Sequence, residues 1–239
     1  MTKPGRYFFT SAAVIVLVMT VIGFHRYYTS GEGEGGRKIS PDLFHLVLVH
    51  GTLMTAWMVL FLVQALLISS NRRRLHMKLG WLGVAVAAGV TVSGSMLAVQ
   101  SVRAIPTIPF FGMAYRQFLL VMLVEIAVFA SFVLAGVLFR KRPEKHRPMM
   151  LLASLSILGG ATVRMPFLFP IYGAAGCIGI FGPIFTLGAI LLVARSARLG
   201  TLDKPFAAGY AVMVVAYAAA CQLAFSDAWT RLSGPLLNS

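Results

Sequence analysis

The sequence predicts an all-α membrane protein, a polytopic helical bundle of about seven transmembrane helices that forms one domain over residues 1–239. Hydrophobic residues make up 58% of the chain and charged residues only 12%, which is about half the charged share of a soluble domain. The apolar residues form long runs, and a helix needs about 20 such residues to cross a bilayer. Short basic clusters separate the runs, as in integral membrane proteins.

Seven apolar runs are long enough to be transmembrane helices. They lie near residues 7–25, 42–70, 78–100, 113–139, 148–170, 172–195 and 205–227. The first run is longer than the apolar part of a signal peptide and no small-residue cleavage motif follows it, so we expect it to be retained. The fifth and sixth runs meet at Pro170, Ile171 and Tyr172, which predicts a tight helical hairpin.

The basic residues predict the orientation of the bundle. Fourteen of the 21 lysines and arginines fall on alternate loops, namely Lys3, Arg6, Arg72, Arg73, Arg74, Lys78, Arg140, Lys141, Arg142, Lys145, Arg147, Arg195, Arg198 and Lys204. Because cytoplasmic loops carry the excess of positive charge, the N-terminus is expected inside and the C-terminus outside. The net charge of +14 therefore reflects membrane topology, and we expect no nucleic-acid partner.

Two histidines lie within the second apolar run, at His45 and His50. A neutral imidazole has one donor and one acceptor to satisfy, and lipid supplies neither. Five residues rotate a helix by about 140°, so the two rings face different directions and cannot easily share one metal ion. We expect His45 near the membrane interface. The deeper His50 is a candidate binding residue, and the alternative is a hydrogen bond to a neighbouring helix.

Two charged residues, Glu125 and Arg164, also fall inside predicted spans. An isolated charge at such depth costs at least a few kcal/mol, so both side chains should face the bundle interior and pair with each other. This pair could simply fix helix register. Alternatively, His50, Glu125, Arg164 and Arg116 could line a polar pocket in the outer half, suited to a haem propionate, a quinone head group or a metal.

The histidines sort by membrane side into an inner set, His76 and His146, and an outer set, His25, His45 and His50. His76 and His146 each follow a basic turn and precede an outward-running span. A b-type haem in a helix bundle takes one histidine from each of two helices. His76 with His146 could meet that requirement inside, and His50 with His25 outside. The alternative is that these rings only make hydrogen bonds or face solvent and headgroups.

Other familiar motifs are absent from the sequence. It has no Walker loop, no GxGxxG and no GxSxG, so no catalytic residue is predicted and enzymatic activity stays open. Cys177 and Cys221 lie in apolar runs without CxxC or Cys/His spacing, and no disulfide framework can be read from them. The seventh run has no central lysine, which excludes a retinal Schiff base.

Several segments of spans two to five resemble known bacterial proteins. The segments are His50-Gly51 with Trp57 and Gln64, Leu75-His76 with Leu79-Gly80-Trp81, and residues 144–153 leading to Arg164. They are similar to a group of small, largely uncharacterised bacterial inner-membrane proteins and to histidine-bearing domain-of-unknown-function families, one of them connected with cytochrome oxidase assembly. The resemblance implies the bacterial cytoplasmic (inner) membrane and a respiratory association. The di-haem ascorbate-reducible cytochromes also carry one histidine per helix, but this chain lacks their paired ligands at two depths.

Three functions remain open from the sequence. The leading hypothesis is a protein that binds haem b or a transition metal through histidines and serves a respiratory or electron-transfer complex in the lipid bilayer. The second is a non-catalytic accessory or assembly subunit of a larger membrane complex. The third is a small proton-coupled transporter that uses Glu125. It ranks last because no predicted span shows the internal Gly/Pro break that marks a midplane substrate site.

Overall fold

The computed structural model describes residues 7–32, 38–105 and 109–238, and it is a helical protein with one short strand pair. Five helices of the described chain are long and apolar enough to cross a membrane. They are α3 (Pro41–Ser69), α4 (Arg73–Ala104), α5 (Tyr115–Leu138), α10 (Gly182–Leu199) and α11 (Lys204–Leu223). The predicted class, an all-α bundle compatible with a multi-pass membrane protein, is confirmed at this level.

Shorter elements complete the fold. They are α1 (Phe8–Gly23), α2 (His25–Ser30), the antiparallel strands β1 (Pro109–Phe110) and β2 (Met113–Ala114), α6 (Pro143–Ser156) and α12 (Asp227–Asn238). The ends of α3, α4, α5 and α11 lie within about five residues of the predicted limits, which is the usual scatter at helix ends. The helix α12 lies beyond the last predicted span and was not expected from the sequence.

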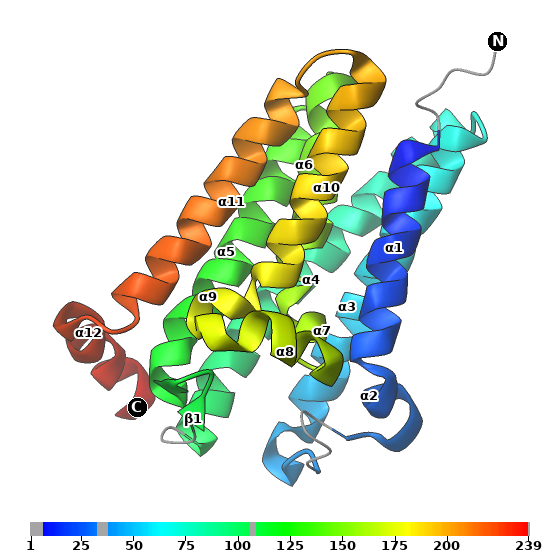
Figure 1. Cartoon of the computed structure of the whole chain (residues 1–239). Coiled ribbons are helices and arrows are strands. Elements are labelled where there is room, and N and C mark those ends of the chain that lie inside the picture. Colours follow the sequence, from blue (N-terminus) through cyan, green and yellow to red (C-terminus); the bar gives the residue numbers. More distant parts are fainter. Residues whose placement is uncertain (1–6, 33–37, 106–108, 239) are drawn as a thin grey trace.

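The long helices run side by side, and three of their connecting turns lie at one end (Figure 1). These turns join α3 to α4, α5 to α6 and α10 to α11, and we call this the basic end, after Arg72–74, Arg140–142, Arg195, Arg198 and Lys204. The strands, α2 and α12 lie at the opposite end. Along the chain, α3 packs on α4, α4 on α5 and α5 on α6, while α11 covers α5 and α6 and α1 covers α3.

The turn between α10 and α11 shows how local chemistry ends one helix and starts the next. Gly200 adopts the left-handed conformation, with φ of 69°, immediately after the last residue of α10, and glycine is the residue that does so without strain. Asp203 caps α11 by accepting from the backbone N–H of Phe206 at 3.1 Å. Arg195 binds the same carboxylate at 3.3 Å. The turn is therefore held at the basic end by a cap and an ion pair.

The predicted continuous helix over 148–170 is wrong. Helix α6 ends at Ser156, and the chain then forms the short helices α7 (Gly159–Thr162), η2 (Pro166–Leu168), α8 (Phe169–Tyr172), η3 (Gly173–Ala175) and α9 (Cys177–Ile180). The direction changes by 96° between the 143–162 and 166–175 segments. The predicted hairpin at 170–172 is also wrong, because α10 begins only at Gly182 and not near residue 172.

The break has a local cause in the sequence. Pro166 and Pro170 each lack a backbone donor and disfavour a helical residue before them. Gly176 takes φ 59° and ψ −135°, a region that side chains rarely enter. A run that is apolar throughout therefore folds as a chain of short turns, and this arrangement positions the buried groups around Glu125 described below.

Helix α1 approaches the broken segment closely at Gly23. A methyl group added at Gly23 would overlap the carbonyl oxygen of Ala161 in α7, which is backbone and cannot move aside cheaply. We expect Gly23→Ala to lower the free energy of unfolding by roughly 1–3 kcal/mol through overpacking. The control is Gly80→Ala in α4, where nothing lies within 4 Å and no loss is expected. Thermal unfolding in detergent measures both, and equal effects would contradict this packing.

Candidate functional site

The structure brings the two histidines of the basic end together. His76 lies in the first turn of α4 and His146 in the first turn of α6, and both helices pack on α5. The centroids of the two imidazole rings are 6.2 Å apart and the ring planes are nearly perpendicular, at 86°. Histidines from two different helices, 70 positions apart in the sequence, therefore lie in an edge contact just inside the basic turns.

The ring of His146 is held in one orientation by the backbone of α5. Its Nδ1 lies 2.8 Å from the carbonyl oxygen of Gly136. A carbonyl can only accept, so Nδ1 carries the proton and Nε2 of the neutral ring keeps its lone pair. This arrangement, in which a backbone carbonyl fixes the tautomer, is the usual support for a histidine that binds a metal.

The ring of His76 contains a nitrogen that lacks a partner. Its Nδ1 is buried and makes no hydrogen bond to any described residue. The main-chain carbonyl of Gln64 lies within hydrogen-bonding range of the same ring, and Arg73 and Arg147 lie within electrostatic range of it. Since buried ring nitrogens are normally hydrogen-bonded, to protein or to water, the unpaired Nδ1 is a position at which an added group could bind.

Two residues of α3, one of them at the level of His76, also have buried polar atoms without a partner in the described structure. The indole Nε1 of Trp57 and both carboxamide atoms of Gln64 are buried and have no hydrogen-bond partner in the described part of the chain. Together with His76 Nδ1 they are four of the five buried side-chain atoms in this condition, the fifth being Glu125 Oε1. The unmet hydrogen bonds therefore concentrate on α3 and the start of α4.

No group of three or more His, Cys, Asp or Glu side chains that could hold a metal ion occurs within residues 7–32, 38–105 and 109–238. A structural zinc site takes four such ligands, so a zinc centre of that type is not supported here. His76 and His146 supply two imidazoles at this position, half the ligand number of such a site.

His50 lies between α3 and α4 and contacts Ser93. Its Nδ1 is 3.0 Å from Ser93 Oγ, and this hydroxyl donates its own proton to the carbonyl of Gly89 at 2.7 Å. The imidazole must therefore be the donor to Ser93. Ser93 is 17 residues along α4 from His76, which corresponds to about 25 Å of helix. His50 thus makes the interhelical hydrogen bond that the sequence offered as its alternative role, at a level far from the His76–His146 pair.

The remaining outer histidines stay at the surface. His25 is exposed and donates from Nδ1 to the carbonyl of Ile22 at 2.8 Å. His45 is exposed too, and its ring lies 5.8 Å from that of Phe44. Among the described side chains no hydrogen bond or ring contact joins His25 or His45 to His50. The predicted outer pair of His50 and His25 is therefore not formed.

Glu125 and Arg164, which the sequence predicts to pair, both lie beside the adjacent glycines Gly159 and Gly160 at the start of α7. Arg164 donates from Nη1 to the carbonyl of Gly160, and its guanidinium lies 4.8 Å from the ring centroid of Phe24. The buried Oε1 of Glu125 faces Gly159, where an added methyl group would lie 2.5 Å from it. Arg116 is exposed, so the four predicted residues do not form one outer pocket.

Glu125 lies against the break in the fifth apolar run. Tyr217 of α11 is fully buried there and donates its hydroxyl to the carbonyl of Ser156, the last residue of α6, at 2.7 Å. This hydrogen bond satisfies a carbonyl that the interrupted helix leaves open. The expectation that no apolar run is broken in its interior is therefore wrong, and a carboxylate lies at the break.

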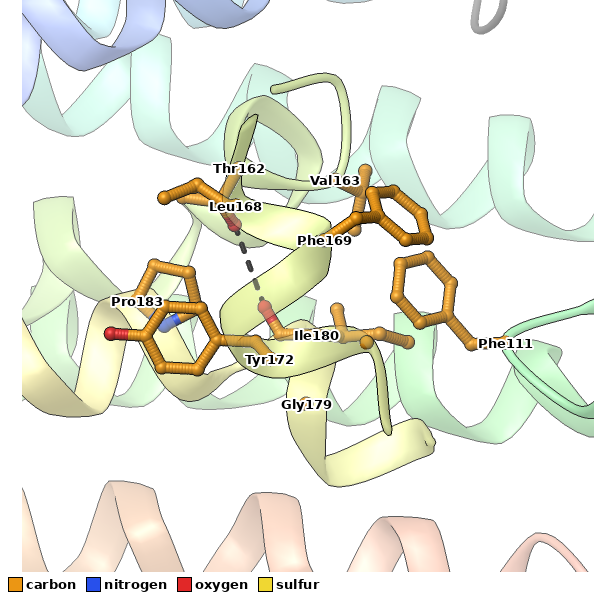
Figure 2. Close-up of a pocket in the computed structure, with 10 residues that line it drawn as sticks. Phe111, Thr162, Val163, Leu168, Phe169, Tyr172, Gly179, Ile180 and Pro183 are labelled. Atoms are coloured by element: carbon orange, nitrogen blue, oxygen red, sulfur yellow. Dashed lines mark hydrogen bonds between the residues drawn. The ribbon is translucent and has the colours of Figure 1, made fainter. Parts of the chain in front are cut away.

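A small hollow lies further along the broken segment (Figure 2). Its volume is about 20 Å³, and Thr162, Tyr172, Ile180 and Pro183 form one side of it. The rings of Phe111 and Phe169 stack at 5.0 Å on the other side. Pockets for cofactors and drug-sized ligands measure roughly 300–1,000 Å³, so this hollow is below that range and we assign it no ligand.

Several residues of the site could not be identified as such from the sequence. The roles of Gly136, Ser93 and Tyr217 depend on hydrogen bonds between distant helices. Gln64 could have been recognised as a candidate, because it is an amide side chain inside an apolar run. Cys177 and Cys221 form a disulfide that links α9 to α11 across 44 residues, and only the broken segment brings them together.

Comparison of the chain with protein-family models, with curated proteins and with solved structures finds no match. The resemblance to bacterial inner-membrane proteins stays a prediction.

Proposed function

We propose that this protein is a haem-binding membrane bundle of the electron-transfer type, in which His76 and His146 would hold the iron. A metal–imidazole bond is about 2.0 Å long, so two rings that bind one ion have centroids at most roughly 6 Å apart. The ring centroids of His76 and His146 are 6.2 Å apart. This distance is the single observation that carries the proposal.

The surrounding residues fit the same group. The carbonyl of Gly136 leaves Nε2 of His146 available, and Nδ1 of His76 has no protein partner in the described residues. Arg73 and Arg147 lie near the His76 ring, and arginines are the usual partners of carboxylates such as haem propionates. When bound, haem supplies one-electron chemistry. The chain itself would orient the two imidazoles, which are half-buried in the first turns of α4 and α6.

We further propose that all seven apolar runs lie in the membrane, with the basic end in the cytoplasm. Lys3 and Arg6, which belong to the same charge pattern, lie outside the described residues. The disulfide supports this orientation independently. Cys221 is 17 residues along α11 from Lys204, about 25 Å from the basic end. Disulfides persist on the exported side of the bacterial cytoplasmic membrane and are rare in the cytosol.

The proposal is tested on the full chain purified in detergent. We expect a Soret absorbance band and about one extractable haem per chain, because a single opposed histidine pair can hold one iron. A folded, monodisperse protein with neither haem nor metal above background would overturn the proposal. That outcome would favour an accessory subunit, in which the histidines only specify packing.

A second candidate function is favoured by the broken segment. Discontinuous helices with a charged group at the break are typical of transporter substrate sites, and Glu125 lies at such a break. If the protein moves protons, we expect Glu125→Gln to reduce proton flux into proteoliposomes at least tenfold, because the amide cannot exchange a proton. The control is Glu144→Gln at the exposed start of α6. Flux unaffected by Glu125→Gln would remove this function.

A further inference from the structure

Three buried atoms on one side of α3 define a second site beside the histidine pair. Trp57 and Gln64 are seven residues apart, so they lie on the same face two turns apart, separated by about 10.5 Å along the axis. Trp57 is only 3% exposed, and its Nε1 and both carboxamide atoms of Gln64 have no partner among the described residues. An unmade buried hydrogen bond is costly, so such atoms indicate a group that the protein chain does not supply.

The chemistry of these atoms restricts that group. Indole Nε1 can only donate, and the carboxamide of Gln64 offers both donors and an acceptor. The ligand must therefore carry at least one acceptor oxygen, and a hydroxyl would also satisfy Gln64 Oε1. The surroundings are apolar and aromatic, since Phe129 lies edge-on to Trp57 at 5.0 Å and Phe61, four residues along α3, is also buried.

We propose that Gln64 and Trp57 form a binding site for the head group of a membrane-soluble quinone. A quinone is a flat ring with carbonyl oxygens that accept from N–H groups. Its reduced form carries hydroxyls that can also donate to Gln64 Oε1. Its apolar tail suits a position within the spanning helices. Water offers the same hydrogen-bonding atoms, and the experiment below separates the two.

The position of this site gives it a role. The main-chain carbonyl of Gln64 lies beside the ring of His76, so a head group bound by Gln64 would adjoin the proposed haem ligand. In that role the inference rests on the proposed function, because the quinone pool would be the redox partner of the centre. The binding itself does not depend on haem and is measured separately.

The fluorescence of Trp57 reports binding directly. The chain has three tryptophans, so Trp81→Phe with Trp229→Phe leaves Trp57 as the single emitter in the full-length protein. We expect a short-tailed benzoquinone to quench this emission saturably. In the same background Gln64→Leu weakens the apparent Kd at least fivefold, and Gln222→Leu, at an exposed glutamine of α11, leaves it unchanged.

A second measurement covers variants that fold poorly or lack the probe. Quinone extracted from the purified protein is quantified by chromatography, and we expect Trp57→Phe, which keeps a ring but loses the N–H, to retain less than half of the parent content. Quenching that does not saturate, or the same Kd in Gln64→Leu and Gln222→Leu, would show that only water fills the site and would overturn the inference. Saturable binding in His146→Ala, which lacks the proposed haem ligand, separates this result from a failure of the haem proposal.

Discussion

Replacing His146 with alanine is expected to remove the bound haem, and replacing His76 is expected to do the same. Each substitution deletes one of the two imidazoles whose centroids lie 6.2 Å apart, so the iron loses one of its two bonds to the protein. We expect the Soret absorbance per chain to fall at least tenfold in either variant. The measurement is an absorption spectrum at matched protein concentration after purification.

The matched control is His45→Ala. This histidine lies on α3 but is exposed, and its ring contacts only Phe44 among the ring pairs of the described residues. Haem content should stay at the level of the unmodified protein. If His76→Ala and His146→Ala also retained full haem content, the two rings would not be the ligands and their proximity would be a packing contact.

Removing the disulfide is expected to cause the largest loss of stability. Cys177 and Cys221 close a segment of 44 residues, and a cross-link of that span restricts the unfolded chain by about 4 kcal/mol. Cys177→Ser with Cys221→Ser should therefore lower Tm by roughly 10 °C for a chain of this size. Thermal unfolding in detergent, with and without reductant, measures the effect.

Reductant provides the control for this prediction. It should lower Tm of the unmodified protein by a similar amount and leave the double serine variant unchanged, because that variant has no bond to reduce. A Tm that is insensitive to reductant in both proteins, together with two titratable thiols in the untreated protein, would contradict the disulfide. It would also remove the independent support for an exported position of α9 and the end of α11.

The lengths of the apolar runs correctly predicted the regular helices. They did not predict the break in the chain between α6 and α10. The limits of α3, α4, α5 and α11 follow the runs, because a lipid-facing helix must satisfy its own backbone. The run from 148 to 195 is equally apolar, but Pro166, Pro170 and Gly176 interrupt it. Apolar composition alone does not reveal such breaks. The backbone groups that a break leaves open are satisfied by side chains distant in the sequence, as the carbonyl of Ser156 is by Tyr217.

The part of the site that depends only on helix topology was predictable from the sequence. Residues that follow two turns at the same end of a bundle lie at one level, so His76 and His146 could be expected to meet. Side-chain partners were not predictable in this way. Arg164 donates to the carbonyl of Gly160, four residues before it in the chain, and a glycine carbonyl gives no signal in the sequence. His50 is hydrogen-bonded to Ser93 on α4. A serine in an apolar run does not stand out in the sequence as a hydrogen-bond partner.

The midpoint reduction potential of His76 and His146 variants measures whether both imidazoles bind one iron. Methionine in place of one histidine would keep a ligand on the iron and raise the potential. We expect His76→Met and His146→Met each to raise the midpoint by on the order of 0.1 V, while His50→Met leaves it unchanged. Equal potentials in the unmodified protein, His76→Met and His146→Met would contradict ligation of one iron by this pair.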